Sequence, residues 1–445
     1  MSSCKKVALY TLGCKVNQYE TESIKNQMIR SGFEIVDFEE KADYYIVNTC
    51  TVTNIADRKS RNMLRRAKRA NKDGIVIVTG CYAQTNSEDL SKMDEIDYII
   101  GNTDKKNIIN FIQDIEETEL FSESKNNKNK IKLNNVFLYK DYDEYGIADF
   151  REMCRVYIKI QDGCNNFCSY CKIPFARGKS RSRNKENILE EVKKIGEEGF
   201  KEIIIIGINL GTYGEDITGK EEFNNIMREI LDKKCIERVR VGSFYPDKIT
   251  DEFAELFSDK NLMPHLHISL QSCDDKILKK MKRKYDSSLI EEKLVKLREK
   301  VPLMEFTGDI IVGFPGETDE MFQNTYNLIE KIGFSGLHIF PYSDRENTEA
   351  ANFIEKVPGK IKRERVTLLE QLRDKMGYQI RKKYIGTELN VLIDEEDSEY
   401  YYGYSENYLR VKLKKTNKIS QTKILNKIKK LKINLAEKEM LMSNG

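Results

Sequence analysis

Two separate stretches of the chain alternate between short apolar runs and amphipathic helical patterns, and this alternation constrains the fold more than any other feature. The first stretch predicts helices such as 19–31 and 54–70 between strands at 6–12, 43–48, 75–79 and 96–100. The second predicts strands, again separated by helical segments, at 155–160, 201–206, 236–242, 266–270, 306–312 and 335–340. Strands that alternate with helices pair in parallel. The pattern therefore predicts an α/β protein with two parallel sheets.

These stretches divide the chain into four regions. Residues 1–113 are predicted to form a parallel α/β domain, and residues 151–380 an incomplete (βα)6 barrel, because a closed barrel needs eight such units. Residues 114–150 lose the pattern and are expected to form a linker or loop with a weak strand near 136–140. Residues 381–445 contain short alternating runs rich in tyrosine, which predict a small β-barrel.

Composition excludes several classes of protein. With 40% hydrophobic and 33% charged residues, the chain fits a soluble globular protein, and its apolar runs are too short to cross a membrane. Ten cysteines in 445 residues are too few for a disulfide scaffold, and no signal-peptide core precedes the first strand. We therefore expect a cytoplasmic protein, in which clustered cysteines are metal ligands or catalytic thiols.

Three cysteines form a C-x3-C-x2-C motif directly after the first barrel strand, namely Cys164, Cys168 and Cys171. A structural zinc site or a set of inert thiols is one interpretation. Zinc sites need four ligands, however, and the sequence offers neither a second C-x2-C pair nor a histidine nearby. Three thiolates instead suit a cubane iron–sulfur cluster in which one iron stays open to another ligand.

Three further cysteines, Cys14, Cys50 and Cys81, each follow a predicted strand of the first region and precede a predicted helix. The carboxyl ends of parallel strands meet at one edge of a sheet, so these thiols can converge. Helix N-termini also favour thiolates. The alternative is three unrelated buried cysteines, since free cysteine is often buried.

The C-x3-C-x2-C motif, with the aromatic Tyr170 before its third cysteine, resembles the signature of radical S-adenosylmethionine (SAM) enzymes. The resemblance implies that SAM binds the open iron of a [4Fe-4S] cluster, with Tyr170 near the adenine. Glycine-rich and polar segments after later strands resemble the SAM-side loops of such enzymes. On this basis we expect cofactor contacts at Gly207, Asn209, Gln271 and Gly313.

The segments TLGCKVNQYET, VNTCTVT and TGCYAQ closely resemble the amino-terminal domain of methylthiotransferases, a radical SAM family that replaces C–H by C–SCH3. The resemblance extends over about residues 5–440, and the chain from 384 onward resembles an RNA-binding TRAM domain. It implies a second, sulfur-donating [4Fe-4S] cluster on Cys14, Cys50 and Cys81, and an external electron donor. The catalytic groups would then be the six cysteines of the two clusters.

Within this family, segments 163–167, 173–178, 207–214 and 343–351 resemble the MtaB branch. That branch acts on N6-threonylcarbamoyladenosine at position 37 of tRNA, so the anticodon stem-loop is the expected partner. Residues 241–246 depart from the usual pattern of the branch. Alternative substrates are isopentenyl-adenosine of tRNA and a ribosomal-protein aspartate. A more distant alternative is a non-enzymatic iron–sulfur sensor that binds RNA.

Basic residues gather in three runs without any acid, at 58–69, 172–185 and 410–432. A single run is usually a solvated face, but three runs suggest a polyanionic partner. The second run adjoins the central cysteines, and we expect phosphate contacts from Arg177, Lys179, Arg181 and Arg183. The tyrosines between 400 and 408 either stack on bases or form the two faces of a strand.

Overall fold

A computed structural model describes residues 4–121, 130–145, 154–415 and 424–444 of the chain. The chain forms two compact units that do not follow its linear order. The first comprises Met1–Asp149 with two later segments, Gln161–Arg183 and Ser343–Ala351. The second comprises Phe150–Ile160, Asn184–Tyr342 and Asn352–Gly445. The segment that carries the C-x3-C-x2-C motif therefore belongs to the same unit as the amino-terminal cysteines.

The first unit is built on a six-stranded parallel sheet with the order β2-β1-β3-β4-β5-β6. Its strands are β1 (Lys6–Thr11), β2 (Glu34–Ile35), β3 (Tyr44–Thr49), β4 (Ile75–Gly80), β5 (Tyr98–Ile100) and β6 (Lys130–Lys132). The four predicted strands are confirmed. The weak strand expected near 136–140 is wrong, because β6 lies earlier and the Asn135 side chain accepts from the Phe137 N–H, which favours a turn there.

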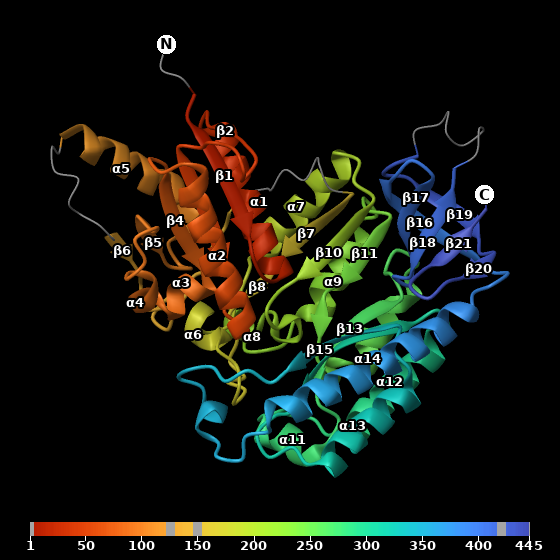
Figure 1. Cartoon of the computed structure of the whole chain (residues 1–445). Helices are drawn as coiled ribbons and strands as arrows, with labels where there is room; N and C mark the ends of the chain where they lie inside the picture. The colour runs from red at the N-terminus through yellow and green to blue at the C-terminus, as the bar shows by residue number, and fades with distance from the viewer. Residues whose placement is uncertain (1–3, 122–129, 146–153, 416–423, 445) are drawn as a thin grey trace. The chain divides into compact units, whose positions relative to one another are not determined.

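Helices cover both faces of this sheet and bury two separate apolar cores (Figure 1). On one face, α1 (Lys15–Arg30) and α5 (Ile108–Phe121) pack against strand residues such as Ile46. On the other face, α2 (Asn54–Ala70) packs Leu64 and its neighbours against Val76 and Val78. Successive side chains of a strand point to opposite faces of the sheet. Because helices cover both faces here, the strands are hydrophobic at nearly every position.

The second unit contains the predicted incomplete barrel, whose strands are all parallel. One sheet has the order β11-β10-β7 and the other β12-β13-β14-β15. The strands are β7 (Arg155–Lys159), β10 (Glu202–Ile206), β11 (Arg238–Val241), β12 (Ser243–Phe244), β13 (His265–Gln271), β14 (Glu305–Val312) and β15 (Gly336–Pro341). Strands β11 and β12 are separated only by Gly242, so six strand positions are filled, as the sequence predicts.

The helices between these strands also match the expected pattern. They are α7 (Lys185–Glu197), α9 (Phe223–Asp232), α10 (Asp251–Glu255), α11 (Asp275–Lys280), α12 (Ser287–Lys300) and α13 (Asp319–Ile332), and the long helix α14 (Gly359–Lys382) follows β15. Helices α12, α13 and α14 lie together along β13–β15 in Figure 1. Shorter elements are β8 (Gln161–Asp162), β9 (Arg181–Ser182), α3 (Cys81–Thr85), α4 (Ser87–Leu90), α6 (Ile173–Arg177) and α8 (Glu215–Thr218).

The carboxyl-terminal region forms a six-stranded sheet with the order β19-β16-β17-β18-β21-β20. Its strands are β16 (Glu388–Glu396), β17 (Tyr400–Ser405), β18 (Arg410–Lys414), β19 (Ile428–Lys432), β20 (Leu435–Ala436) and β21 (Leu441–Ser443). Strand β19 lies within the basic run 410–432. Leu431 packs into the core of the sheet, and the lysines on either side of it are exposed. A curled sheet of this kind is consistent with a TRAM-like domain.

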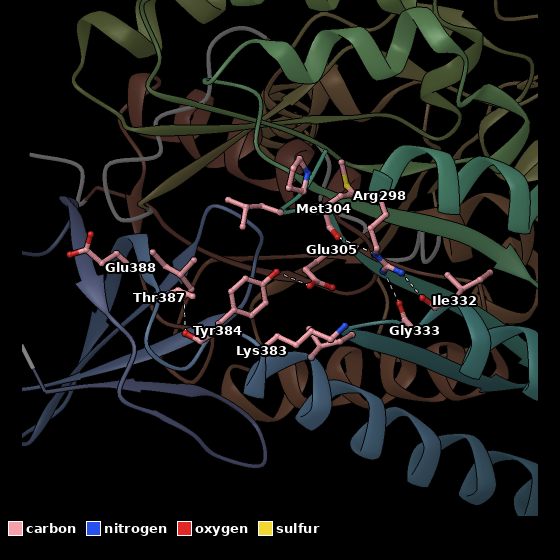
Figure 2. Close-up of a pocket in the computed structure, with 13 residues that line it drawn as sticks. Arg298, Met304, Glu305, Ile332, Gly333, Lys383, Tyr384, Thr387 and Glu388 are labelled. Atoms are coloured by element: carbon pink, nitrogen blue, oxygen red, sulfur yellow. Dashed lines mark hydrogen bonds between the residues drawn. The ribbon is translucent and has the colours of Figure 1, made fainter. Parts of the chain in front are cut away.

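This sheet is anchored to the barrel strands by buried arginines. Arg238 Nη2 donates to Asn390 O at 2.6 Å, and Arg240 Nη2 donates to Ser405 O at 2.7 Å. A nearby pocket of about 350 Å³ lies where α14 meets the sheet. In it the Tyr384 hydroxyl donates to Glu305 Oε1 at 2.8 Å (Figure 2). Among the described helices, none is both long and apolar enough to span a bilayer.

Candidate active site

The structure brings Cys14, Cys50 and Cys81 together at the carboxyl edge of the first sheet. Cys14 is the N-cap of α1 after β1, Cys50 follows β3, and Cys81 opens α3 after β4. The strand order reverses between β1 and β3, and ligands of open α/β sheets bind at such a switch point. All three thiols are free, and each of Cys14 and Cys50 interacts electrostatically with the other cysteines.

Two glycines beside these cysteines leave no room for a side chain of their own. A Cβ on Gly13 would lie 2.7 Å from Cys50 Cβ and 2.9 Å from its Sγ. Gly80 has a φ of +98°, and a Cβ there would lie 2.4 Å from Thr49 O. A larger residue at position 13 would therefore press on Cys50, and one at position 80 would press on the backbone of Thr49, the residue before Cys50.

The electrostatics of this site fit a positively charged partner. Burial, and then the neighbouring Cys81 and Cys14, raise the pKa of Cys50 to about 12. Cys14 is the exposed member of the three. Thiols that lie this close together lose their protons readily only when a metal binds, because the positive charge of the metal then stabilises the thiolates. The donor set therefore fits the iron–sulfur cluster that the sequence predicts.

The segment 161–183 is closed into a loop by β8 and β9, which pair in antiparallel fashion. Inside the loop, Gln161 Nε2 donates to Gly163 O at 2.8 Å and to Ser180 Oγ at 2.9 Å. Gly163 has a φ of +69°, and a Cβ there would lie only 1.9 Å from Lys179 O. The loop thus holds Cys164 and Cys168 in buried positions, with Cys171 partly exposed.

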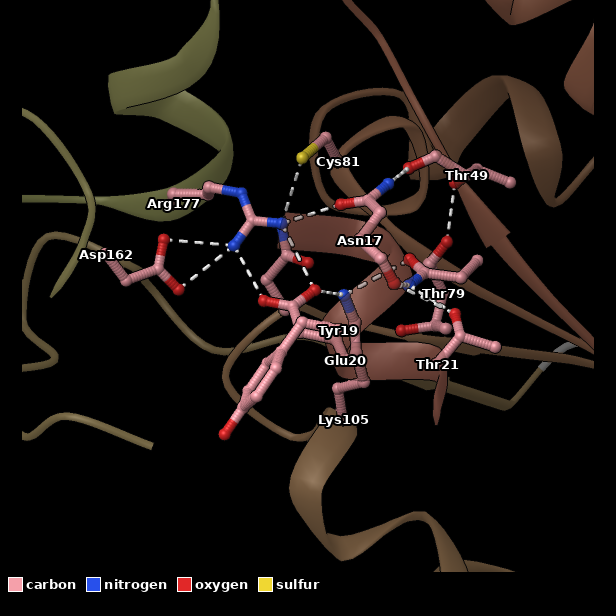
Figure 3. A network of polar contacts seen from close by, with 12 residues as sticks. Asn17, Tyr19, Glu20, Thr21, Thr49, Thr79, Cys81, Lys105, Asp162 and Arg177 are labelled. Atoms are coloured by element: carbon pink, nitrogen blue, oxygen red, sulfur yellow. Dashed lines mark hydrogen bonds and ion pairs between the residues drawn. The ribbon is translucent and has the colours of Figure 1, made fainter. Parts of the chain in front are cut away.

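Arg177 joins this loop to helix α1 through a buried ionic network (Figure 3). Its Nη1 lies 2.8 Å from Glu20 Oε1 and 3.0 Å from Asp162 Oδ1, and its Nη2 donates to Asn17 Oδ1 at 2.7 Å. Lys105 Nζ lies 2.6 Å from Glu20 Oε2, so two buried carboxylates balance two buried cations. The network lies one and two turns along α1 from Cys14 and ties both cysteine sets to one scaffold.

Asn102 and Arg345 provide two more links within this unit. Asn102 Nδ2 donates to Ala176 O at 2.7 Å and lies 3.7 Å from Cys81 Sγ. Arg345 Nη2 donates to Thr51 Oγ1 at 2.6 Å, next to Cys50, and pairs with Asp57 Oδ2 at 2.7 Å. The segments 161–183 and 343–351 are thereby both bound beside the amino-terminal cysteines.

Sequence reasoning missed most of these polar partners. One signal was available for two of them, because Asn17 and Glu20 are three residues apart and so share a face of α1. Both lie on its buried side, where polar residues need partners. Those partners are far away in the sequence, so no local pattern indicates them.

The expected SAM contacts fall in both units. Tyr170 belongs to the cysteine loop, whereas the other four lie at carboxyl ends of barrel strands. Gly207 follows β10, Asn209 caps the turn at Leu210–Thr212, and Gly313 follows β14. Gln271 ends β13 with a φ of +65°, a strained conformation that often marks functional positions. Their contacts with SAM stay a prediction.

The structure corrects the expected role of three basic residues. Arg177 is only 1% exposed and is held by the network described above. Arg181, also buried, donates to Arg177 O at 2.7 Å, and buried Arg183 pairs with Glu144 at 2.7 Å. Guanidinium groups that are buried on protein partners cannot reach RNA phosphates. Lys179 is exposed, and of the four it alone remains suited to such a contact.

Several tyrosines of the carboxyl-terminal sheet are likewise engaged within the protein. Tyr401 is part of the core of the sheet, and Tyr404 stacks on Tyr408 with ring centroids 4.7 Å apart. Arg155 lies over the ring of Tyr404 at 4.4 Å. Tyr400, Tyr402 and Tyr404 lie on the face of β17 opposite Tyr401, and all three are partly exposed. The strand-packing interpretation therefore holds for Tyr401, whereas Tyr408 lies in the turn between β17 and β18.

Comparisons with known proteins identify the class first. The model of the radical SAM superfamily matches residues 158–329, and that of "Uncharacterized protein family UPF0004" matches residues 6–101. A solved radical SAM methyltransferase, TsrM from Kitasatospora setae with cobalamin and a [4Fe-4S] cluster bound, superposes with a TM-score of 0.59. The superposition covers 78% of this chain and 77% of the TsrM chain, and the two sequences are 16% identical. The fold is thus that of a radical SAM enzyme, which uses SAM and an iron–sulfur cluster.

Curated relatives then narrow the class. The threonylcarbamoyladenosine tRNA methylthiotransferase MtaB of Bacillus subtilis is 40% identical over 94% of this chain and 93% of its own. The corresponding protein of Aquifex aeolicus is 38% identical over 92% and 96%. A tRNA-2-methylthio-N(6)-dimethylallyladenosine synthase of Syntrophus aciditrophicus is 33% identical over 95% and 88%. The chain therefore belongs to the tRNA methylthiotransferase family, in the MtaB group.

Proposed function

We propose that this enzyme adds a methylthio group to carbon 2 of N6-threonylcarbamoyladenosine at position 37 of tRNA. The observation that carries the proposal is the match over nearly the whole chain to relatives that are named for this modified base. The arrangement of the six cysteines supports it, because all of them belong to one compact unit. Insertion of sulfur into a C–H bond needs a radical source and a sulfur source close together.

The two sets of cysteines have different surroundings, which suit two different tasks. Cys164, Cys168 and Cys171 lie on a loop that leaves Cys171 partly exposed, as a cluster that must also bind SAM requires. Cys14, Cys50 and Cys81 converge at one edge of the first sheet, where Gly13 places only backbone beside Cys50. When bound, SAM and the two [4Fe-4S] clusters would supply the radical that removes hydrogen and the sulfur that replaces it.

The remaining residues of the unit hold this arrangement rather than perform chemistry. Arg177 and Asn102 connect the cysteine loop to α1 and to Cys81, so they fix the relative position of the two sets. Arg345 fixes the segment beside Cys50. A displacement of about 1 Å at such a site can lower a rate by two orders of magnitude. We therefore assign these three to positioning.

The anticodon stem-loop is the proposed RNA partner, and residues 381–445 the proposed RNA-binding domain. Position 37 lies in an unpaired loop, from which a base can be extended into a protein site. Lys179, Tyr400 and Tyr402 are exposed or partly exposed, and they offer a phosphate contact and stacking surfaces. A tRNA substrate also suits the expected cytoplasmic location, and reductive cleavage of SAM requires an external electron donor.

The first test is to count iron and sulfide after anaerobic reconstitution. We expect about eight of each per chain, and about four in the Cys14→Ala/Cys50→Ala/Cys81→Ala variant, because each [4Fe-4S] cluster holds four. The variant should still cleave SAM but form no methylthio product. Four irons in the unmutated enzyme would contradict the second cluster.

The second test separates the substrates. The enzyme is incubated with two tRNA preparations, one carrying the threonylcarbamoyl group and one carrying the isopentenyl group, and the nucleosides are identified by mass spectrometry. Product from the first tRNA alone is expected. Product from the second alone would favour the dimethylallyladenosine relatives. Absence of SAM cleavage, together with redox-dependent RNA binding, would favour a sensor.

A further inference from the structure

The three histidines of the chain all lie on the second barrel sheet, away from any cysteine motif in the sequence. His265 and His267 are on β13, and His338 is on β15. Between these strands runs β14, which carries Thr307 and Asp309. The register pairs His267 with Thr307 and Asp309 with His338. Four polar side chains are thus neighbours on adjacent strands.

These side chains share one face of the sheet. Along β14, Thr307 and Asp309 alternate with Phe306, Gly308 and Ile310, which are buried. Side chains of a strand point to opposite faces in turn, so the polar residues lie on the face opposite the apolar packing. The side chains of His267, Asp309 and His338 are 12%, 26% and 68% exposed. The group is therefore open to solvent on one side and enclosed on the other.

The contacts within the group have the spacing of metal ligands. His267 Nε2 lies 3.0 Å and His338 Nδ1 lies 3.1 Å from the same atom, Asp309 Oδ1, and all three atoms lie within 4.8 Å of one another. Two ligands bound about 2.1 Å from one zinc ion are about 3.0–3.4 Å apart at octahedral or tetrahedral angles. The exposed His338 ring can turn to complete the site.

The surroundings of the group also resemble those of a metal site. His267 Nδ1 contacts Thr307 Oγ1 at 2.9 Å, and His265 Nε2 contacts the same hydroxyl at 3.0 Å. A metal-bound histidine typically uses its second nitrogen in such a hydrogen bond, which fixes the ring.

We propose that His267, Asp309 and His338 form a binding site for one divalent first-row transition-metal ion. Two imidazoles and one carboxylate suit zinc, iron(II), manganese or nickel, and three protein ligands leave positions for water or for an oxygen donor of a substrate. The site is distinct from both cysteine sets and needs neither cluster nor SAM. The proposal does not depend on the proposed tRNA substrate.

The test uses the reconstituted full-length enzyme, so that iron occupies the cluster cysteines, and measures zinc uptake by equilibrium dialysis against Zn²⁺ with elemental analysis. The unmutated enzyme is expected to bind about one zinc more per chain than a His267→Gln/His338→Gln variant. Asp309→Asn should weaken binding at least tenfold, and Thr307→Val by about 10–100-fold, because that hydroxyl orients the ring. His265→Gln removes the one histidine that is not a proposed ligand, and it should weaken binding less than Thr307→Val does, because Thr307 keeps its contact with His267.

Iron content and thermal melting are measured on every variant, so that loss of folding is recognised. A second measurement needs no variant at all. Zinc-edge X-ray absorption of the loaded unmutated enzyme should show nitrogen and oxygen ligands with imidazole scattering. Sulfur ligation would overturn the proposal by assigning the zinc to cysteines. Equal zinc uptake by the unmutated enzyme and the double variant, both with full iron content, would also overturn the proposal. The three residues would then form a hydrogen-bonded triad that binds no metal.

Discussion

At the scale of single residues, the chain uses its buried charges for architecture. Arg177 and Lys105 lie among Glu20 and Asp162, where each charge is balanced by an opposite one. Removing one member leaves an uncompensated charge in a buried site, so Arg177→Gln should destabilise the protein by about 3–5 kcal/mol. Arg177→Lys keeps the charge without the planar fork and should cost less. Chemical denaturation of the full chain measures both.

Lys179, two residues away, provides the matched control for that experiment. Its side chain is exposed, so Lys179→Gln should leave the free energy of unfolding within about 0.5 kcal/mol of the unmutated value. The same variant tests the RNA surface. If Lys179 contacts a phosphate, tRNA affinity falls and the slope of log affinity against log salt decreases by about one. An unchanged slope would exclude that contact.

At the scale of elements, the short β8–β9 hairpin determines the shape of the cysteine loop. Gly163→Ala would place a Cβ 1.9 Å from Lys179 O, at a positive φ that alanine disfavours, so the hairpin cannot close. We expect iron content to fall from about eight to about four per chain, with loss of SAM cleavage. Gly199→Ala, at a φ of +86° with open space around it, is the control and should keep full iron. Equal iron in both variants would contradict this role.

At the scale of the whole molecule, cluster binding should stabilise one unit and not the other. All six cysteines belong to the first unit, so removal of iron withdraws ligand binding from that unit only. Hydrogen exchange should then accelerate in 161–183 and around Cys14, Cys50 and Cys81. Exchange in β13–β15 and β16–β18 should stay the same. Acceleration spread evenly over both units would show that the clusters stabilise the chain globally.

Much of this organisation is determined by the sequence alone, because it rests on local periodicity. The alternation of apolar runs and helical patterns predicts both parallel sheets, and each of the ten strands that it predicts is observed, whereas the short β2, β6, β8 and β9 are not predicted. A cysteine that follows a parallel strand must lie at the carboxyl edge of its sheet. The convergence of Cys14, Cys50 and Cys81 therefore follows from the predicted fold.

Only the tertiary structure decides which segments share a unit and which charges are buried. No local pattern shows that 161–183 and 343–351 join the amino-terminal domain, since their partners lie up to 294 residues away. For the same reason, the sequence of a basic run does not show whether its side chains face solvent or are buried against carboxylates. Arg177 is held by Glu20, and His267 meets Asp309 and His338, only because folding places distant strands and helices side by side.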